Sequence, residues 1–87
     1  MRELIFKNES FDELQDWLRN DRKSAERLVR ILQECRRTPF EGIGKPEPLK
    51  GQLQGYWSRR INEKDRIIYE VSVEAVFVYS LKGHYEK

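Results

Sequence analysis

The feature that most constrains this chain is a run of chain-breaking residues near its middle. All three prolines and two of the five glycines fall between residues 38 and 48. Proline fixes φ and has no backbone N–H, so this run excludes a continuous helix or a central strand. It is also longer than most connections in a compact domain. The chain is therefore divided into two parts, each with its own secondary structure.

The part before this run is mainly helical in pattern. The apolar stretch 2–7 is too short for a helix and predicts a first strand. Ser10 followed by Glu13 fits a capping box, which predicts the start of a helix that ends near residue 20. Apolar residues at helical spacing predict a second helix over 22–37. The short break between the two predicts an antiparallel helical hairpin.

The part after the run is rich in β-branched and aromatic residues. Strands are predicted over 57–62, 66–73 and 75–81, with turns at 62–65 and at Glu74. Leu49–Leu53 is a candidate for a further short strand.

This order of elements, β-α-α-β-β-β, predicts the fold class. Consecutive strands joined by short turns form hairpins, so we expect an α+β fold with a small antiparallel sheet and the two N-terminal helices on one face. A chain of 87 residues can form one such domain but not two, so we expect a single domain over residues 1–87.

Charge is unevenly distributed along the chain. Residues 36–66 hold eight basic and four acidic side chains, a net charge of +4, whereas the segments on either side are each net −1. A localised basic region suits a partner that carries phosphate. An arginine-rich solvated surface explains the charge equally well.

Single copies of cysteine and histidine limit the chemistry. Cys35 cannot form an internal disulfide, and its helical spacing from Leu28 and Leu32 predicts a buried, inert thiol. One cysteine and one histidine do not make a structural zinc site, and we expect no metal or other cofactor. No stretch is apolar enough for a signal peptide or a membrane span, so a cytoplasmic protein is expected.

Titratable residues supply two candidate groups. Glu47 stands between Pro46 and Pro48, and both prolines restrict the backbone that presents its carboxylate. Pro-Glu-Pro also occurs in ordinary rigid loops, and on spacing alone that interpretation is favoured. His84 follows the last predicted strand, where a histidine is usually only solvated.

Arginines near the predicted turn form the third candidate group. Arg59 and Arg60 point to opposite faces of one strand, so at most one of them joins a given site. Arg66 opens the next strand. The planar guanidinium suits a phosphate oxyanion. For any single one of these arginines a structural salt bridge is favoured, and for the three as a group the two interpretations are level.

Taken together, these groups could cleave RNA without a metal. Attack of a 2′-hydroxyl on the adjacent phosphate requires a base, an acid and fixed positive charge beside the phosphate. A carboxylate, an imidazolium and a guanidinium fill those roles. The sequence alone does not show that Glu47, His84 and an arginine converge.

Four stretches of the chain carry a resemblance to a known family. They are RRTPFEGIGKPEPLK at 36–50, GYWSRRI at 55–61, RIIY at 66–69 and HY at 84–85. In this order, and over essentially the whole chain, they resemble the YoeB (Txe) toxins of the RelE/ParE superfamily.

This resemblance implies a ribosome-dependent endoribonuclease that cleaves mRNA in the 30S A site, next to 16S rRNA. Glu47 would be the general base, His84 the general acid, and Arg66 would stabilise the transition-state phosphate. Tyr85 would position the substrate, with Lys50 and Arg59 as further phosphate contacts. The implied protein partners are a neutralising YefM-like antitoxin and a second copy of the toxin in a homodimer.

Two other functions compete with this one. A ParE-like toxin would share the fold and inhibit DNA gyrase by binding, without needing Glu47 and His84 together. A plain RNA-binding module would need no catalytic groups, but the chain has no aromatic sheet motif of the RNP type and no long basic run.

Overall fold

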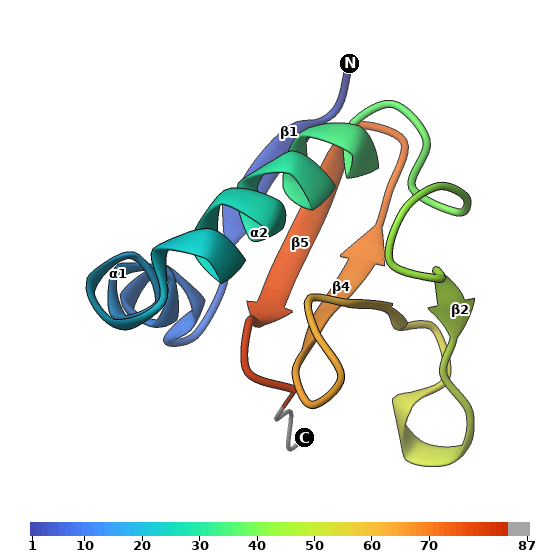
Figure 1. Cartoon of the computed structure of the whole chain (residues 1–87). Coiled ribbons are helices and arrows are strands. Elements are labelled where there is room, and N and C mark those ends of the chain that lie inside the picture. Colours follow the sequence, from blue (N-terminus) through green and yellow to red (C-terminus); the bar gives the residue numbers. More distant parts are fainter. Residues whose placement is uncertain (84–87) are drawn as a thin grey trace.

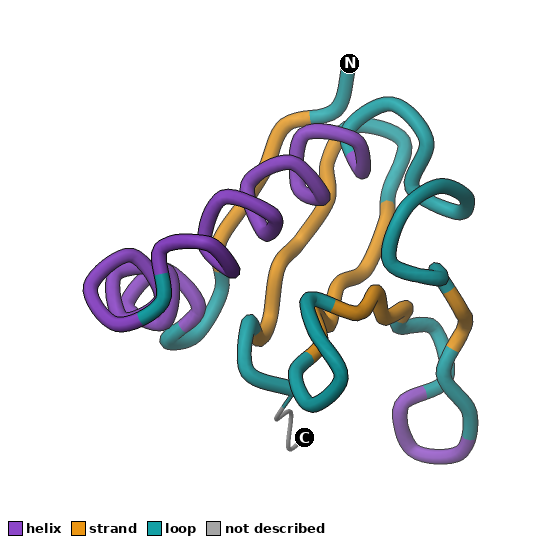
Figure 2. The backbone as a smooth tube through the Cα atoms, in the orientation of Figure 1, coloured by secondary structure: helices purple, strands orange, loops and turns teal. Residues whose placement is uncertain are grey.

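The computed structural model describes residues 1–83, which form two helices and five strands (Figures 1 and 2). The elements are β1 (Glu3–Phe6), α1 (Ser10–Asn20), α2 (Arg22–Cys35), β2 (Glu47–Pro48), the 3-10 turn η1 (Gly51–Leu53), β3 (Trp57–Arg60), β4 (Arg66–Val71) and β5 (Ala75–Ser80). Within the described part of the chain, neither helix is long and apolar enough to cross a membrane.

The strands form one sheet in the order β1-β5-β4-β3-β2. The predicted α+β class and the position of both helices on one face are confirmed. The prediction of a purely antiparallel sheet is wrong for β1, which pairs with β5 in parallel. Short turns fix the direction of consecutive strands, but two helices follow β1, so packing alone decides its neighbour.

The expected strand at Leu49–Leu53 is also wrong, because the strand lies earlier. Glu47 and Pro48 pair with Ser58 and Trp57, and the chain then turns through η1. Proline cannot donate to a sheet, so Pro48 suits the edge position that β2 occupies. This shift brings Glu47 into the sheet itself.

The core lies between α2 and the helix-facing side of the sheet. Figure 1 shows α2 crossing in front of β1 and β5. The buried cluster consists of Leu28, Ile31, Leu32, Cys35, Ile61, Ile67, Tyr69, Val76, Val78 and Leu81. Cys35 is buried as expected, and burial raises the pKa of its thiol to about 11, which keeps it protonated at neutral pH.

Helix α1 is fastened to β5 by two residues that the sequence predicted as a capping box. Ser10 is fully buried and its hydroxyl donates to the Val78 carbonyl at 3.0 Å. The Glu13 carboxylate accepts from the backbone N–H of Leu81 at 2.7 Å. The capping-box prediction is therefore wrong. A buried polar side chain must find a partner, and here β5 supplies it.

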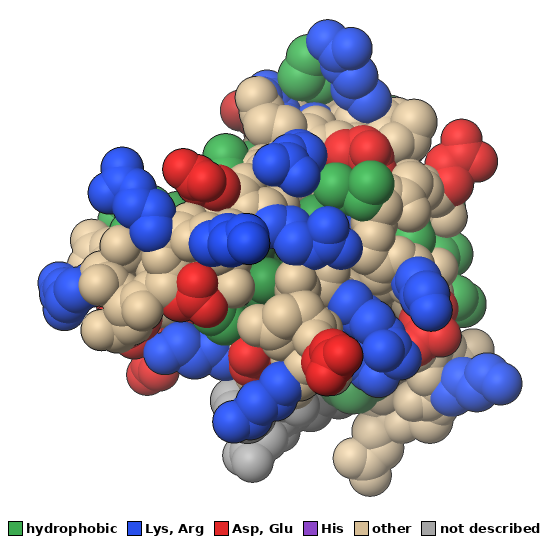
Figure 3. Space-filling view, viewed as in Figure 1, with side chains coloured by type: hydrophobic (Ala, Val, Ile, Leu, Met, Phe, Trp, Pro, Cys, Tyr) green, Lys and Arg blue, Asp and Glu red, His purple; other side chains and the backbone are tan. Residues whose placement is uncertain are grey.

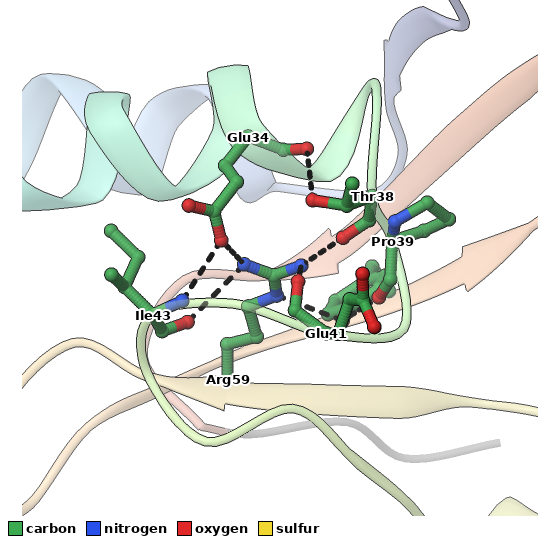
Figure 4. Close-up of polar contacts among 7 residues, drawn as sticks. Glu34, Thr38, Pro39, Glu41, Ile43 and Arg59 are labelled. Atoms are coloured by element: carbon green, nitrogen blue, oxygen red, sulfur yellow. Dashed lines mark hydrogen bonds and ion pairs between the residues drawn. The ribbon is translucent and has the colours of Figure 1, made fainter.

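A buried arginine holds the irregular segment between α2 and β2 (Figure 4). The Arg59 side chain is fully inaccessible to solvent, and its Nη1 lies 2.5 Å from Glu34 Oε1. Its two Nη groups also donate to the carbonyls of Thr38, Glu41 and Ile43. The Nε donates to the Tyr69 hydroxyl, which in turn donates to the Pro39 carbonyl at 2.6 Å. We call this network the Arg59 clamp.

One glycine allows the segment to close over the clamp. Gly42 has φ of +124°, a conformation that side chains rarely adopt. A Cβ on Gly42 would lie 1.6 Å from Glu34 Oε1. A larger residue would therefore push the segment away from the carboxylate that neutralises Arg59.

We expect Arg59→Ala to lower the free energy of unfolding by about 3–5 kcal/mol, because it leaves a set of buried acceptors without their donor. Arg60→Ala, next in the chain but exposed, should change it by less than about 0.5 kcal/mol. Urea denaturation followed by circular dichroism measures both. Equal losses in the two variants would contradict the assignment of Arg59 as the clamp.

The clamp also predicts how stability depends on pH. The hydrogen bond from Arg59 lowers the pKa of the Glu34 carboxyl from its ordinary value of 4.5. Ionised Glu34 thus stabilises the fold above the unfolded-state pKa, and this contribution is lost as pH falls through the lower folded-state pKa. The unfolding free energy of the wild type should therefore fall more steeply below about pH 5 than that of Glu34→Gln. Urea denaturation at several pH values measures both proteins. If their unfolding free energies depend on pH with the same slope, the expectation is wrong.

Candidate active site

Two of the predicted site residues meet on the surface of the sheet. Glu47 Oε1 lies 3.7 Å from Arg66 Nη1, and the two side chains are 58% and 40% exposed. They come from β2 and β4, which β3 separates. A carboxylate and a guanidinium from distant parts of the sequence are thus presented together to solvent.

The strand register explains this meeting. Glu47 pairs with Ser58, and Ser58 pairs with Ile68, so the three side chains share one face of the sheet. Arg66 is two residues before Ile68 and lies on that face too. Ile67 and Tyr69 point the other way, into the core below the helices. The candidate site therefore occupies the face that the helices leave uncovered.

The expected role of Arg59 in substrate contact requires correction. Arg59 pairs with Ile67 and so points into the core, where the clamp uses its donors. Arg60 takes the outward position instead. It is exposed and sits directly opposite Arg66 in the sheet. Like charges directly opposite one another are destabilising, so such a pair suits an anionic ligand better than it suits stability.

The sequence indicated part of the role of Arg60 but could not distinguish it from Arg59. Alternation along a strand showed that only one of Arg59 and Arg60 could join the site. Which one depends on which face the helices cover, and the register of β3 against β4 decides that.

Of the three remaining predicted site residues, only Lys50 lies within the described part of the chain. Lys50 is exposed just before η1, and its side chain makes no hydrogen bond or ion pair within residues 1–83. His84 and Tyr85 lie outside the described residues. The last described residue, Gly83, donates its backbone N–H to the Arg66 carbonyl at 3.0 Å. The described chain therefore ends beside one of the two paired site residues.

A rigid loop carries the chain from the clamp to Glu47. Gly44 has φ of +84°, and its carbonyl accepts the Arg60 N–H at 2.6 Å. Lys45 follows with φ of +53°, and then Pro46 restricts the backbone before Glu47. The loop is thus held against β3 immediately before the strand that presents the carboxylate.

The chemistry available at this site is acid–base and electrostatic. Within residues 1–83, no three His, Cys, Asp or Glu side chains are grouped so as to hold a metal ion. Glu47 can accept a proton, and Arg66 and Arg60 can stabilise an anion. These are two of the three elements that phosphodiester cleavage by an internal hydroxyl requires.

Comparison with known proteins shows the family to which the chain belongs. Residues 6–85 match the family model described as the YoeB-like toxin of bacterial type II toxin–antitoxin systems. The chain belongs to this family. The YoeB-like match covers the rigid loop, β2 and all of the strands that bear the site.

Similar proteins match this chain in sequence and fold along nearly its whole length. Toxin RelK of Mycobacterium tuberculosis is 44% identical over 98% of this chain and 100% of its own length. The solved YoeB/ParE toxin from Agrobacterium tumefaciens superimposes with a TM-score of 0.88 at 40% identity, covering 95% of this chain and 99% of that one. A heterotetrameric YoeB–YefM toxin–antitoxin complex from Staphylococcus aureus gives 0.85 at 36% identity, covering 98% and 99%.

The rigid loop yields a prediction with a matched control. A Cβ on Gly44 would lie 2.9 Å from the Arg60 carbonyl oxygen, whereas one on Gly55, also at positive φ, would meet nothing within 4 Å. We expect Gly55→Ala to cost about 1–2 kcal/mol of stability, from backbone strain alone. Gly44→Ala should cost clearly more, because it adds the steric contact. Urea midpoints measure both, and equal costs would mean that the loop does not press on β3.

Proposed function

We propose that this YoeB-like toxin is a ribosome-dependent endoribonuclease that cleaves mRNA in the 30S A site. The observation that carries the proposal is the pairing of Glu47 and Arg66, 3.7 Å apart, on the face of the sheet opposite the helices. The 2′-oxygen and the phosphate that it attacks belong to one reacting centre. A base and a phosphate clamp must therefore stand within a few ångströms of each other, as these two groups do.

In the proposed mechanism, Glu47 takes the proton from the 2′-hydroxyl as it attacks the adjacent phosphorus. Arg66 donates to the non-bridging oxygens, where negative charge develops. The bond to the 5′-oxygen breaks, and His84 gives that oxygen a proton. The products are a cyclic phosphate on one fragment and a free 5′-hydroxyl on the other, with no metal needed.

The roles of His84 and Tyr85 rest on the family resemblance and on the position of Gly83. Because Gly83 is hydrogen-bonded to Arg66, the polypeptide passes this pair immediately before residue 84. We assign His84 as the general acid and Tyr85 as a substrate-positioning residue. Lys50 remains a proposed phosphate contact, and Arg60 replaces Arg59 in that role.

The exposure of the site supports a need for the ribosome. The paired side chains of Glu47 and Arg66 are 58% and 40% exposed, and within residues 1–83 we identify only Arg60 and Lys50 as further groups that could orient a substrate. The ribosome would hold the mRNA and 16S rRNA in place, which supplies the alignment that the small protein lacks. Purified toxin should therefore cut free RNA poorly.

Two protein partners complete the proposal. A YefM-like antitoxin would neutralise the toxin, as the toxin–antitoxin family to which it belongs implies. A homodimer is the second expected assembly, and sedimentation velocity over a range of concentrations would test it. The ParE-like alternative receives less support, because the matched family is YoeB-like and inhibition of gyrase by binding does not require a general base.

The test is primer extension on a message translated in a purified bacterial system. Glu47→Gln and His84→Ala should each reduce ribosome-dependent cleavage on the order of 10²- to 10⁴-fold, the usual effect of removing an acid or a base. Glu41→Gln is the matched control, since Glu41 is an exposed carboxylate in the same loop. Its cleavage should equal that of the wild type.

Two results would overturn the proposal. One is undiminished cleavage by Glu47→Gln. The other is the absence of any cut while translation stops, or while DNA supercoiling by purified gyrase is inhibited. The second result would favour a toxin that acts by binding alone.

A further inference from the structure

A basic groove adjoins the candidate site, between α2, the rigid loop and the turn that connects β3 to β4. It has a volume of about 410 Å³, and three cationic residues, Arg27, Lys45 and Arg60, are among those that line it. They come from three separate elements of the chain. The fold therefore gathers positive charge that is dispersed in the sequence.

These three charges are not neutralised by the protein. Within residues 1–83, the ion pairs involve other cations, namely Arg59, Arg66 and Lys82. Glu63 also lines the groove but is paired with none of the three. Figure 3 shows Lys and Arg side chains gathered over α2 and the loops below it on this face. The groove thus carries three positive charges against one negative charge, and none of the three cations is held in an ion pair within residues 1–83.

The groove is also held in shape before any ligand arrives. The Arg27 Nε donates to the Ile61 carbonyl at 2.8 Å, which leaves its terminal amino groups for a ligand. The backbone N–H of Arg60 is fixed to the Gly44 carbonyl, and Lys45 keeps a left-handed backbone beside it. Charges fixed in place lose little conformational entropy when they bind an anion.

Arg60 connects this groove to the candidate site. It lines the groove and also stands opposite Arg66, the partner of Glu47. Arg60 therefore belongs both to the lining of the groove and to the strand position beside the reacting centre. Positive charge in both places fits a ligand with regularly spaced negative charges that extends away from the site.

We propose that the groove binds the phosphate backbone of an RNA strand, with Arg27 and Lys45 each contacting a phosphate. This inference rests on the proposed function in that it takes RNA as the target. The shared chemistry is the phosphodiester backbone, which the strand being cut or a strand of ribosomal RNA could supply. Neither residue touches the reacting atoms, so each contributes to binding and not to the chemical step.

The test measures binding in the Glu47→Gln background, so that nothing is cut and the result does not depend on cleavage. Anisotropy of a labelled single-stranded RNA, and competition by vacant 30S subunits, are recorded between about 50 and 200 mM KCl. The groove variants are Arg27→Gln and Lys45→Gln. The matched controls are Arg19→Gln and Lys7→Gln, which remove the same charges from exposed positions elsewhere.

Each groove variant should bind about fourfold more weakly near 0.15 M salt, and the slope of log K against log[KCl] should flatten by about 0.7. The controls should change neither quantity. Arg27→Lys separates charge from packing, because it keeps the charge and loses the bond from Nε to Ile61; it should retain the salt slope. Thermal unfolding of each variant shows whether its fold is intact.

The two sources of phosphate give different results. An effect on the free RNA identifies the strand being cut, and an effect on 30S subunits alone identifies ribosomal RNA. Equal losses in groove variants and controls, or no loss in any of them, would overturn the proposal. So would weaker binding of the antitoxin with RNA and 30S binding intact, because the groove would then serve an acidic protein segment. Failure of the cleavage experiment alone would leave this result standing.

Discussion

The buried guanidinium of Arg59 is the interaction on which the rest of this structure depends. It connects Glu34 near the end of α2, the hydroxyl of Tyr69 in β4 and three carbonyls of the irregular segment after α2. A buried charge is costly unless its donors are satisfied, and here an anion and four neutral oxygens satisfy them. The clamp thus converts a proline- and glycine-rich run, which has no regular hydrogen bonds of its own, into an ordered support for β2.

Strand β3 contributes both to the stability of the fold and to the candidate site. Adjacent residues of β3 face opposite sides of the sheet, so Arg59 enters the core while Arg60 faces solvent across from Arg66. The inward arginine fixes the loop that precedes Glu47. The outward arginine places positive charge beside the candidate site. A change at either position therefore affects this region, but by different physical routes: packing and hydrogen bonding for Arg59, and surface charge for Arg60.

The site and the groove both hold positive charges close together, and the stability of the core allows the fold to tolerate their repulsion. Arg60 and Arg66 stand opposite each other, and Arg27 and Lys45 lack carboxylate partners within residues 1–83. Such arrangements weaken a small domain through repulsion between like charges. The core under α2 and the clamp offset that repulsion. Binding of a polyanion would relieve it, which fits a YoeB-like toxin whose proposed target is RNA on the ribosome.

The sequence by itself determined the α+β class, the two N-terminal helices, the central break and the family, because periodicity, proline placement and motif are local properties of the chain. It also offered Glu47 as a candidate, and Arg66 together with Arg59 and Arg60, and the family resemblance assigned roles to Glu47 and Arg66. Only the tertiary structure decided that β1 runs parallel to β5 and that Arg60 and not Arg59 faces the site. It also decided that Ser10 binds β5 and Glu13 binds Leu81, just after β5, instead of capping α1. These outcomes depend on which face of the sheet the helices bury, and a residue's own neighbours in sequence carry no record of that choice.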